Sequence, residues 1–78
     1  MDDAYTRLAH AIVVLAAKDY DAELDWFQQN PPRDEEDKQH ETYLKHQTEL
    51  QSLERFFRSG WFELRSGLDG EALMKKIQ

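Results

Sequence analysis

Asp19 and His46 are the two polar residues whose positions suggest chemistry, because each interrupts an otherwise apolar helical stripe. A carboxylate beside a histidine can serve as an acid/base pair, or it can fix the register of two packed helices. Burying a carboxylate is costly unless it is paired, and the sequence supplies no nucleophile or oxyanion donors to accompany the pair. We therefore expect a structural contact of Asp19 with His46 or with Tyr43, and no catalytic site. The alternative is that one or both side chains are simply exposed.

Metal binding has weak support in the sequence. His40 follows Glu36 by four residues and Glu49 follows His46 by three, so each pair can share one helix face. The two histidines are six residues apart, which places them on different faces, and neither belongs to a zincin motif. The chain has no cysteine, so thiolate sites and disulfides are excluded. We expect ordinary solvated surface at these positions, with no metal and no other cofactor.

Negative charge is concentrated in the middle of the chain. Residues 19–50 contain ten acidic and three basic side chains, and the chain of 78 residues carries a net charge of −6. Phosphate contacts require clustered Lys and Arg, so this composition disfavours direct nucleic-acid binding. Arg55, Arg58 and Arg65 are expected to pack their stems and pair with acids. Either a plain solvated surface or a basic partner fits the acidic segment.

A long amphipathic helix is expected from the N-terminus to about Gln28, with Asp2 or Asp3 as its cap. Asn30, Pro31 and Pro32 should end it, because proline has no N–H and restricts the residue before it. Apolar residues recur along the helix at spacings of three and four, which predicts one buried face. They are Tyr5, Leu8, Ile12, Leu15, Ala16, Tyr20, Leu24 and Phe27.

A second helix is expected to start at the acidic residues 34–37, which suit a helix N-terminus, and to run to Phe57. Its inner positions alternate spacings of four and three. Ser59 and Gly60 should end this helix, and residues 61–66 should form a short helical turn closed by Gly67. Asp69 should cap a last helix. The inner positions of the second helix are Gln39, Tyr43, His46, Leu50, Leu53 and Phe57.

The short linker makes the two long helices antiparallel neighbours, and the C-terminal turn and helix should fold back across one end. The sequence therefore predicts a single all-α domain over residues 1–78, a long helical hairpin. Aromatic side chains should supply most of the core, with Phe57 and Trp61 as its central members. The predicted aromatic core is Trp26, Phe27, Phe56, Phe57, Trp61 and Phe62.

Small size leaves self-association open as a source of stability, so a homodimer is an alternative to a monomer. A membrane partner is not expected, because the longest apolar run, residues 11–17, is far below the roughly 20 residues of a membrane span. The N-terminal residues also lack the basic region and apolar core of a secretory signal.

Residues 8–13, 17–20, 54–64 and 69–73 carry a resemblance to known proteins. The most specific part runs Phe56, Phe57, Arg58, Ser59, any residue, Trp61 and Phe62. It resembles small uncharacterised proteins encoded on prophages and integrative elements of gut bacteria. The likeness omits the acidic middle, and Arg65 stands where those proteins carry an apolar residue. It implies a mobile-element protein in a bacterial cytoplasm and brings no catalytic residues.

Small acidic helical phage proteins often bind and block a host protein, and some imitate the charge pattern of DNA. The hypothesis from the sequence is therefore a non-catalytic, anti-CRISPR-like inhibitor of a basic host protein in a nucleic-acid-binding defence complex. The alternative is a structural or accessory module that pairs with itself or with a phage partner through its aromatic face. For the inhibitor, the expected binding ridge comprises Asp21, Asp25, Asp34, Glu35, Asp37 and Glu41.

Overall fold

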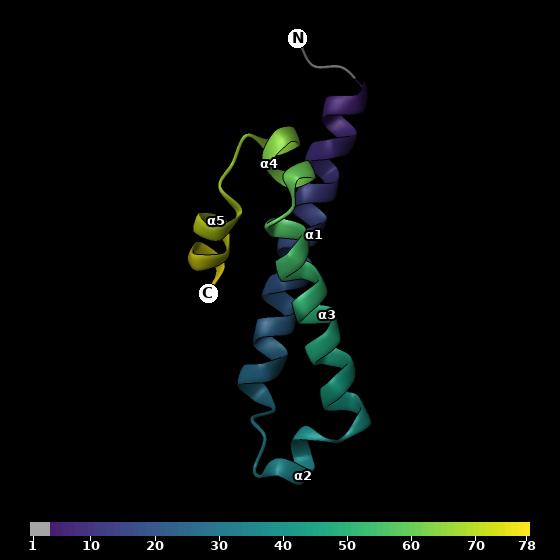
Figure 1. The fold of residues 1–78 in the computed structure, drawn as a ribbon, viewed down its shortest axis with the longest axis vertical. Helices are drawn as coiled ribbons and strands as arrows, with labels where there is room; N and C mark the ends of the chain where they lie inside the picture. The colour runs from purple at the N-terminus through teal and green to yellow at the C-terminus, as the bar shows by residue number, and fades with distance from the viewer. Residues whose placement is uncertain (1–3) are drawn as a thin grey trace.

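The computed structural model describes residues 4–78, and this part of the chain is helical throughout apart from its connections. Helices α1 (Ala4–Gln29) and α3 (Glu41–Phe57) pack side by side as an antiparallel hairpin in a molecule of 52 × 21 × 20 Å (Figure 1). The short helix α2 (Glu35–Lys38) lies at the turn between them. Helices α4 (Gly60–Ser66) and α5 (Gly70–Ile77) fold back against the hairpin. The predicted all-α hairpin is confirmed.

Helix α1 ends within one residue of the predicted boundary. The backbone N–H and the side-chain amide of Asn30 both donate to the carbonyl oxygen of Trp26, each at 2.9 Å. These bonds satisfy a carbonyl that the end of the helix would otherwise leave without a partner. Pro31 and Pro32 then prevent the helix from continuing. The expected cap at Asp2 or Asp3 lies outside the described residues.

The prediction of one continuous second helix is wrong, because the structure divides it into α2 and α3. His40 between them is extended (φ −65°, ψ 140°), and its Nδ1 accepts a hydrogen bond from the N–H of Thr42 at 3.3 Å. His40 therefore caps α3, as Asp34 caps α2. Gln39, predicted to be an inner residue, is exposed at this break.

Local signals at the C-terminal end are confirmed. Ser59 caps α4, its Oγ accepting from the N–H of Phe62 at 3.1 Å. Gly67 closes α4 with φ of 69°, a left-handed conformation that suits glycine. Asp69 caps α5, its Oδ1 accepting from the N–H of Glu71 at 3.0 Å. Two sharp turns therefore bring α4 and α5 back to the hairpin.

The core lies where α1, α3, α4 and α5 meet. Phe57 is its centre, with ring centroids 5.6 Å from Tyr20 and 5.3 Å from Phe62. Tyr20, Phe57, Phe62 and Met74 are the largest fully buried side chains. Phe57 is thus confirmed as core, whereas Trp61 is only partly buried and packs against the edge of the cluster.

Tyr20 connects three helices through its hydroxyl group. The hydroxyl donates to Oε2 of Glu54 at 3.3 Å and accepts from Nε2 of Gln78 at 2.7 Å. Burial raises the pKa of Tyr20 above its ordinary value, and the carboxylate of Glu54 raises it further, while the bond from Gln78 acts in the opposite direction. The protonated hydroxyl therefore ties α1 to α3 and to the C-terminal end of the chain.

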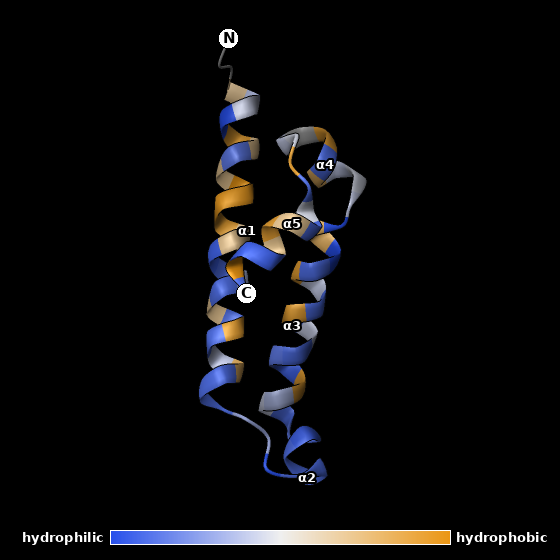
Figure 2. Cartoon of the chain, turned by 90° about the vertical axis from the view of Figure 1, so that its left-hand side faces the viewer, coloured by the Kyte–Doolittle hydropathy of each residue, from blue (hydrophilic) through white to orange (hydrophobic). Residues whose placement is uncertain are grey.

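The predicted buried face is wrong in the N-terminal half of α1. Tyr5, Leu8, Ile12 and Leu15 are exposed. Helix α3 ends at Phe57, level with Tyr20, so it does not reach the first half of α1, which meets the short helix α4 instead. Figure 2 shows strongly apolar residues along this half of α1. The buried positions there are Ala9 and Val13, which were not predicted, and Ala16, which was.

Candidate functional site

Four of the six carboxylates expected to bind a partner lie at the turn of the hairpin, which we call the acidic tip. The acidic tip comprises residues 33–41, with five acidic and two basic side chains. Asp34 precedes α2, Glu35 and Asp37 belong to α2, and Glu41 begins α3. All four are exposed. The structure therefore gathers them at one end of an elongated molecule.

Hydrogen bonds within the acidic tip fix two of its carboxylates. Oδ1 of Asp34 accepts from the N–H of Asp37 at 3.0 Å, and Oδ2 of Asp37 accepts from the N–H of Arg33 at 2.9 Å. Each bond orients a carboxylate and leaves further lone pairs for a partner. Glu35 pairs with Lys38 on the surface, with Oε1 and Nζ 3.3 Å apart. The tip thus has a defined shape and an excess of negative charge.

Asp21 and Asp25 lie apart from the acidic tip, on the outer side of α1. Together with Gln28 and Gln78 they line a shallow hollow of about 190 Å³ between α1 and the end of α5. Asp25 also accepts a hydrogen bond from Gln29, at 3.2 Å. These two carboxylates therefore form a second acidic surface beside α5, and the expected ridge is divided between two places.

A hollow of about 570 Å³ adjoins the acidic tip. Trp26 and Tyr43 contribute aromatic surface to it, Pro32 adds an apolar wall, and Asp37 lies at its edge. An aromatic face beside a carboxylate is a suitable environment for a basic side chain. This hollow was not predicted, because Trp26 and Tyr43 were expected to face the interior of the hairpin.

The expected contact between Asp19 and His46 is wrong. Nδ1 of His46 lies 2.7 Å from Oε2 of Glu23, and its ring stacks on Trp26 with centroids 3.8 Å apart. Asp19 is exposed. Residues 35–40 form α2 and a turn, where the sequence predicted the first turns of one long second helix. Each residue of α3 therefore lies beside a residue of α1 that is closer to the linker than expected. The partner carboxylate is therefore one turn further along α1.

We expect Asp19→Ala to change the free energy of unfolding by less than about 0.5 kcal/mol, because its side chain is exposed. Glu23→Ala should cost about 1–2 kcal/mol, since it removes the hydrogen-bond partner of a half-buried histidine. Urea denaturation followed by circular dichroism measures both. Equal stability of the two variants would contradict the assignment of Glu23 as the partner of His46.

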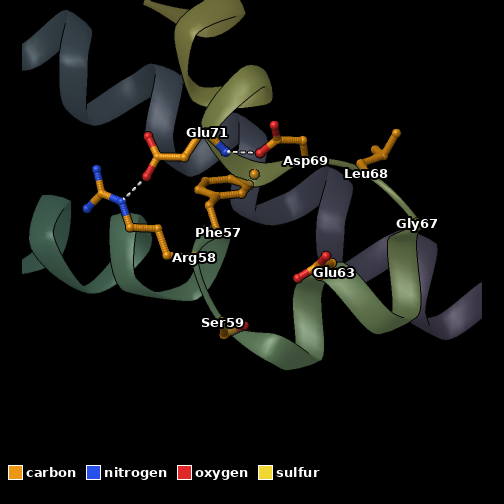
Figure 3. A pocket seen from close by; sticks show the side chains of 9 residues that line it. Phe57, Arg58, Ser59, Glu63, Gly67, Leu68, Asp69 and Glu71 are labelled. Carbon is orange, nitrogen blue, oxygen red and sulfur yellow. Dashed lines mark hydrogen bonds and ion pairs between the residues drawn. The ribbon is translucent and has the colours of Figure 1, made fainter.

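A third hollow, of about 830 Å³, lies where α3, α4 and α5 meet (Figure 3). Three of its charged residues, Arg58, Asp69 and Glu71, have structural partners. The Nε of Arg58 donates to Glu71, and the carboxylate of Asp69 caps α5. Phe57 forms its floor and is buried in the core. This hollow is a junction of helices whose polar groups stabilise the fold.

Among residues 4–78, no three histidine or carboxylate side chains lie close enough together to hold a metal ion. None of the helices described by the structure is long and apolar enough to cross a membrane. Comparison of the chain with protein-family models, with curated proteins and with solved structures finds no match in any of the three.

Proposed function

We propose that this protein is a non-catalytic inhibitor that binds, through its acidic tip, the nucleic-acid-contacting surface of a basic host protein. The target class is a nucleic-acid-binding defence complex, so the role is anti-CRISPR-like. The observation that supports the proposal most directly is the exposed carboxylates of the tip, held in place by local hydrogen bonds.

A protein surface that binds nucleic acid presents clustered Lys and Arg to phosphates. The acidic tip offers five carboxylates within nine residues, on a turn stiffened by Pro31 and Pro32. Its shape is set before binding, so little conformational entropy is lost when a partner docks. The hollow lined by Trp26 and Tyr43 can receive an arginine or lysine of the partner beside Asp37. Charge and shape together support binding to a basic surface.

A charge-matched pair of variants tests the proposal. The tip variant Glu35→Gln/Glu41→Gln and the control Asp19→Asn/Glu63→Gln each remove two exposed carboxylates. The parent is immobilised, a bacterial lysate is applied, and retained proteins are eluted with duplex DNA and identified. We expect the tip variant to bind the eluted protein about tenfold more weakly than the parent, and the control within about twofold. Added salt should weaken the parent's binding steeply.

Asp34 and Asp37 stay unchanged in this test because their carboxylates also hold the turn. A separate variant, Asp21→Asn/Asp25→Asn, reports whether the second acidic surface contributes. Two results would contradict the proposal: no retained protein is released by DNA, or the tip variant binds as tightly as the control at low and high salt alike.

The second candidate is an accessory helical module that associates through an apolar surface. The aromatic side chains of residues 56–62 lie in the core or pack against it, so the surface that favours this role is the exposed aliphatic side of α1. The two candidates differ in their response to salt. A module that associates through apolar surface should bind equally well at low and high salt, because apolar burial does not depend on charge screening.

A further inference from the structure

Helix α1 carries a line of exposed aliphatic residues near its N-terminus, which we call the α1 stripe: Leu8, Ile12 and Leu15. Their exposed fractions are 59, 38 and 59%, and Tyr5, half exposed, continues the line. Scattered apolar residues are common on protein surfaces, but a contiguous band is typical of an interaction site. The spacing of three, four and three residues is the pattern by which one helix packs lengthwise against another.

We propose that the α1 stripe is a dimerisation surface, which packs against the same stripe of a second copy in antiparallel orientation. This surface is separate from the acidic tip, so the proposal stands independently of the proposed function.

Continuity with the interior of the hairpin supports a helical occupant. The same heptad line runs on through Asp19 and Ala22 to Trp26, which stacks on His46 of α3. Helix α3 therefore contacts this line at Trp26, near the turn, and Asp19 and Ala22, between Trp26 and the stripe, are exposed. Figures 1 and 2 both show the first turns of α1 standing beyond α4.

The stripe is complementary to itself when reversed. In an antiparallel pair centred near residue 10, Leu8 meets the partner's Ile12, and Ile12 meets the partner's Leu8. The same symmetry places Tyr5 against the partner's Leu15. Each large residue of the stripe thus finds an apolar counterpart, as a two-fold symmetric interface requires.

The distribution of charge along the chain favours the antiparallel orientation of the two helices over the parallel one. Residues 1–18 contain two acids and two bases and are neutral overall, whereas residues 19–50 hold ten acids against three bases. A parallel pair would align the two acidic segments and repel. An antiparallel pair places the two acidic segments at opposite ends of the dimer. Gln29 is 19 residues from residue 10, the centre of the pair, which is about 28 Å at 1.5 Å per residue. The two acidic tips then lie about 60 Å apart, far beyond the screening length of about 8 Å.

Membrane binding fits the stripe less well. Amphipathic helices that lie on membranes carry Lys and Arg along their polar face, and anionic lipids attract such positive charge. Here the polar side of α1 continues into Asp21 and Asp25, and the chain as a whole carries a net charge of −6. A second copy of the chain fits the stripe better than a membrane does, because the N-terminal segment of each copy, residues 1–18, carries no net charge.

Sedimentation of the full chain from micromolar to millimolar concentration tests the proposal. We expect the parent to reach twice the chain mass of 9.3 kDa. Leu8→Glu/Leu15→Glu should remain at the mass of one chain. The matched control Leu44→Glu/Leu68→Glu changes two exposed leucines elsewhere and should dimerise like the parent. Circular dichroism should show equal helix content in all three, because every changed residue is exposed.

Cross-linking tests the orientation, since the chain has no cysteine of its own. With a short bismaleimide, Ala11→Cys near the centre should yield covalent dimers, and Lys18→Cys should not. Equal cross-linking at both positions would indicate parallel helices. The dimer proposal is overturned if the parent stays a monomer at millimolar concentration, if Leu8→Glu/Leu15→Glu dimerises as the parent does, or if the parent is a monomer that binds anionic vesicles through the stripe.

Discussion

Gly70→Ala is expected to destabilise this protein by about 3 kcal/mol or more, although it adds a single methyl group. A Cβ atom at residue 70 would lie 1.7 Å from the carbonyl oxygen of Phe57 and 2.6 Å from its carbonyl carbon. These are backbone atoms at the end of α3, so no side-chain rotation can relieve the overlap. Helix α5 would have to move away, and with it Met74, which is buried in the core. Overpacking of this kind typically costs 1–3 kcal/mol, occasionally more.

Gly60→Ala is the matched control for that prediction. A Cβ atom at residue 60 meets no atom within 4 Å, and the residue lies in the first turn of α4. We expect its stability to equal or slightly exceed that of the parent, because alanine restricts the unfolded chain more than glycine does. Thermal and urea denaturation of the three proteins would measure the difference. Equal melting of both variants would show that α5 can shift without cost.

The sequence predicted the ends of the helices better than the contacts between them. Asn30, Ser59, Gly67 and Asp69 act on backbone groups within a few residues, so their roles follow from local chemistry. Gly70 acts on a carbonyl thirteen residues earlier, and only the folded chain shows this approach. A glycine after an aspartate reads as part of a turn, so nothing in the local pattern indicates close helix packing at that position.

The register of the hairpin was wrong for a related reason. His40 caps α3 with its ring nitrogen, and no glycine or proline marks the break. Without that break, each residue of α3 would lie about one turn farther from the linker along α1, and His46 would then meet α1 near Asp19. Because the break exists, Glu23 is the partner of His46, and α3 ends before it reaches Leu8. A single unrecognised cap thus explains the wrong ion pair.

The candidate site was predictable in its composition and not in its arrangement. Carboxylates beside a Pro-Pro linker are expected to be exposed, and Asp34, Glu35, Asp37 and Glu41 are. Asp21 and Asp25 lie on α1, and only the docked end of α5 completes the hollow that they line. That docking is a long-range contact, which local patterns do not specify.

Phe62→Ala is expected to cost about 3–5 kcal/mol, the range found when a buried phenylalanine is truncated to alanine. The Phe62 side chain is completely buried, and its ring contacts both Phe56 and Phe57, with centroids 5.8 and 5.3 Å away. A domain of this size is stabilised by only a few kcal/mol, so the variant should be largely unfolded at 25 °C.

Trp61→Ala removes a larger side chain from the adjacent position and should cost less, about 1–2 kcal/mol. Trp61 is only partly buried, and of the aromatic rings in the core it pairs with that of Phe56 alone, at 5.5 Å. Part of the Trp61 side chain already faces solvent, so removing it opens a smaller cavity in the core than removing Phe62 does. Circular dichroism and urea denaturation of both variants would compare them directly. If Trp61→Ala unfolds the protein while Phe62→Ala stays folded, then α4 packs through the opposite face from the one described, and the position of the whole C-terminal segment on the hairpin would have to be revised.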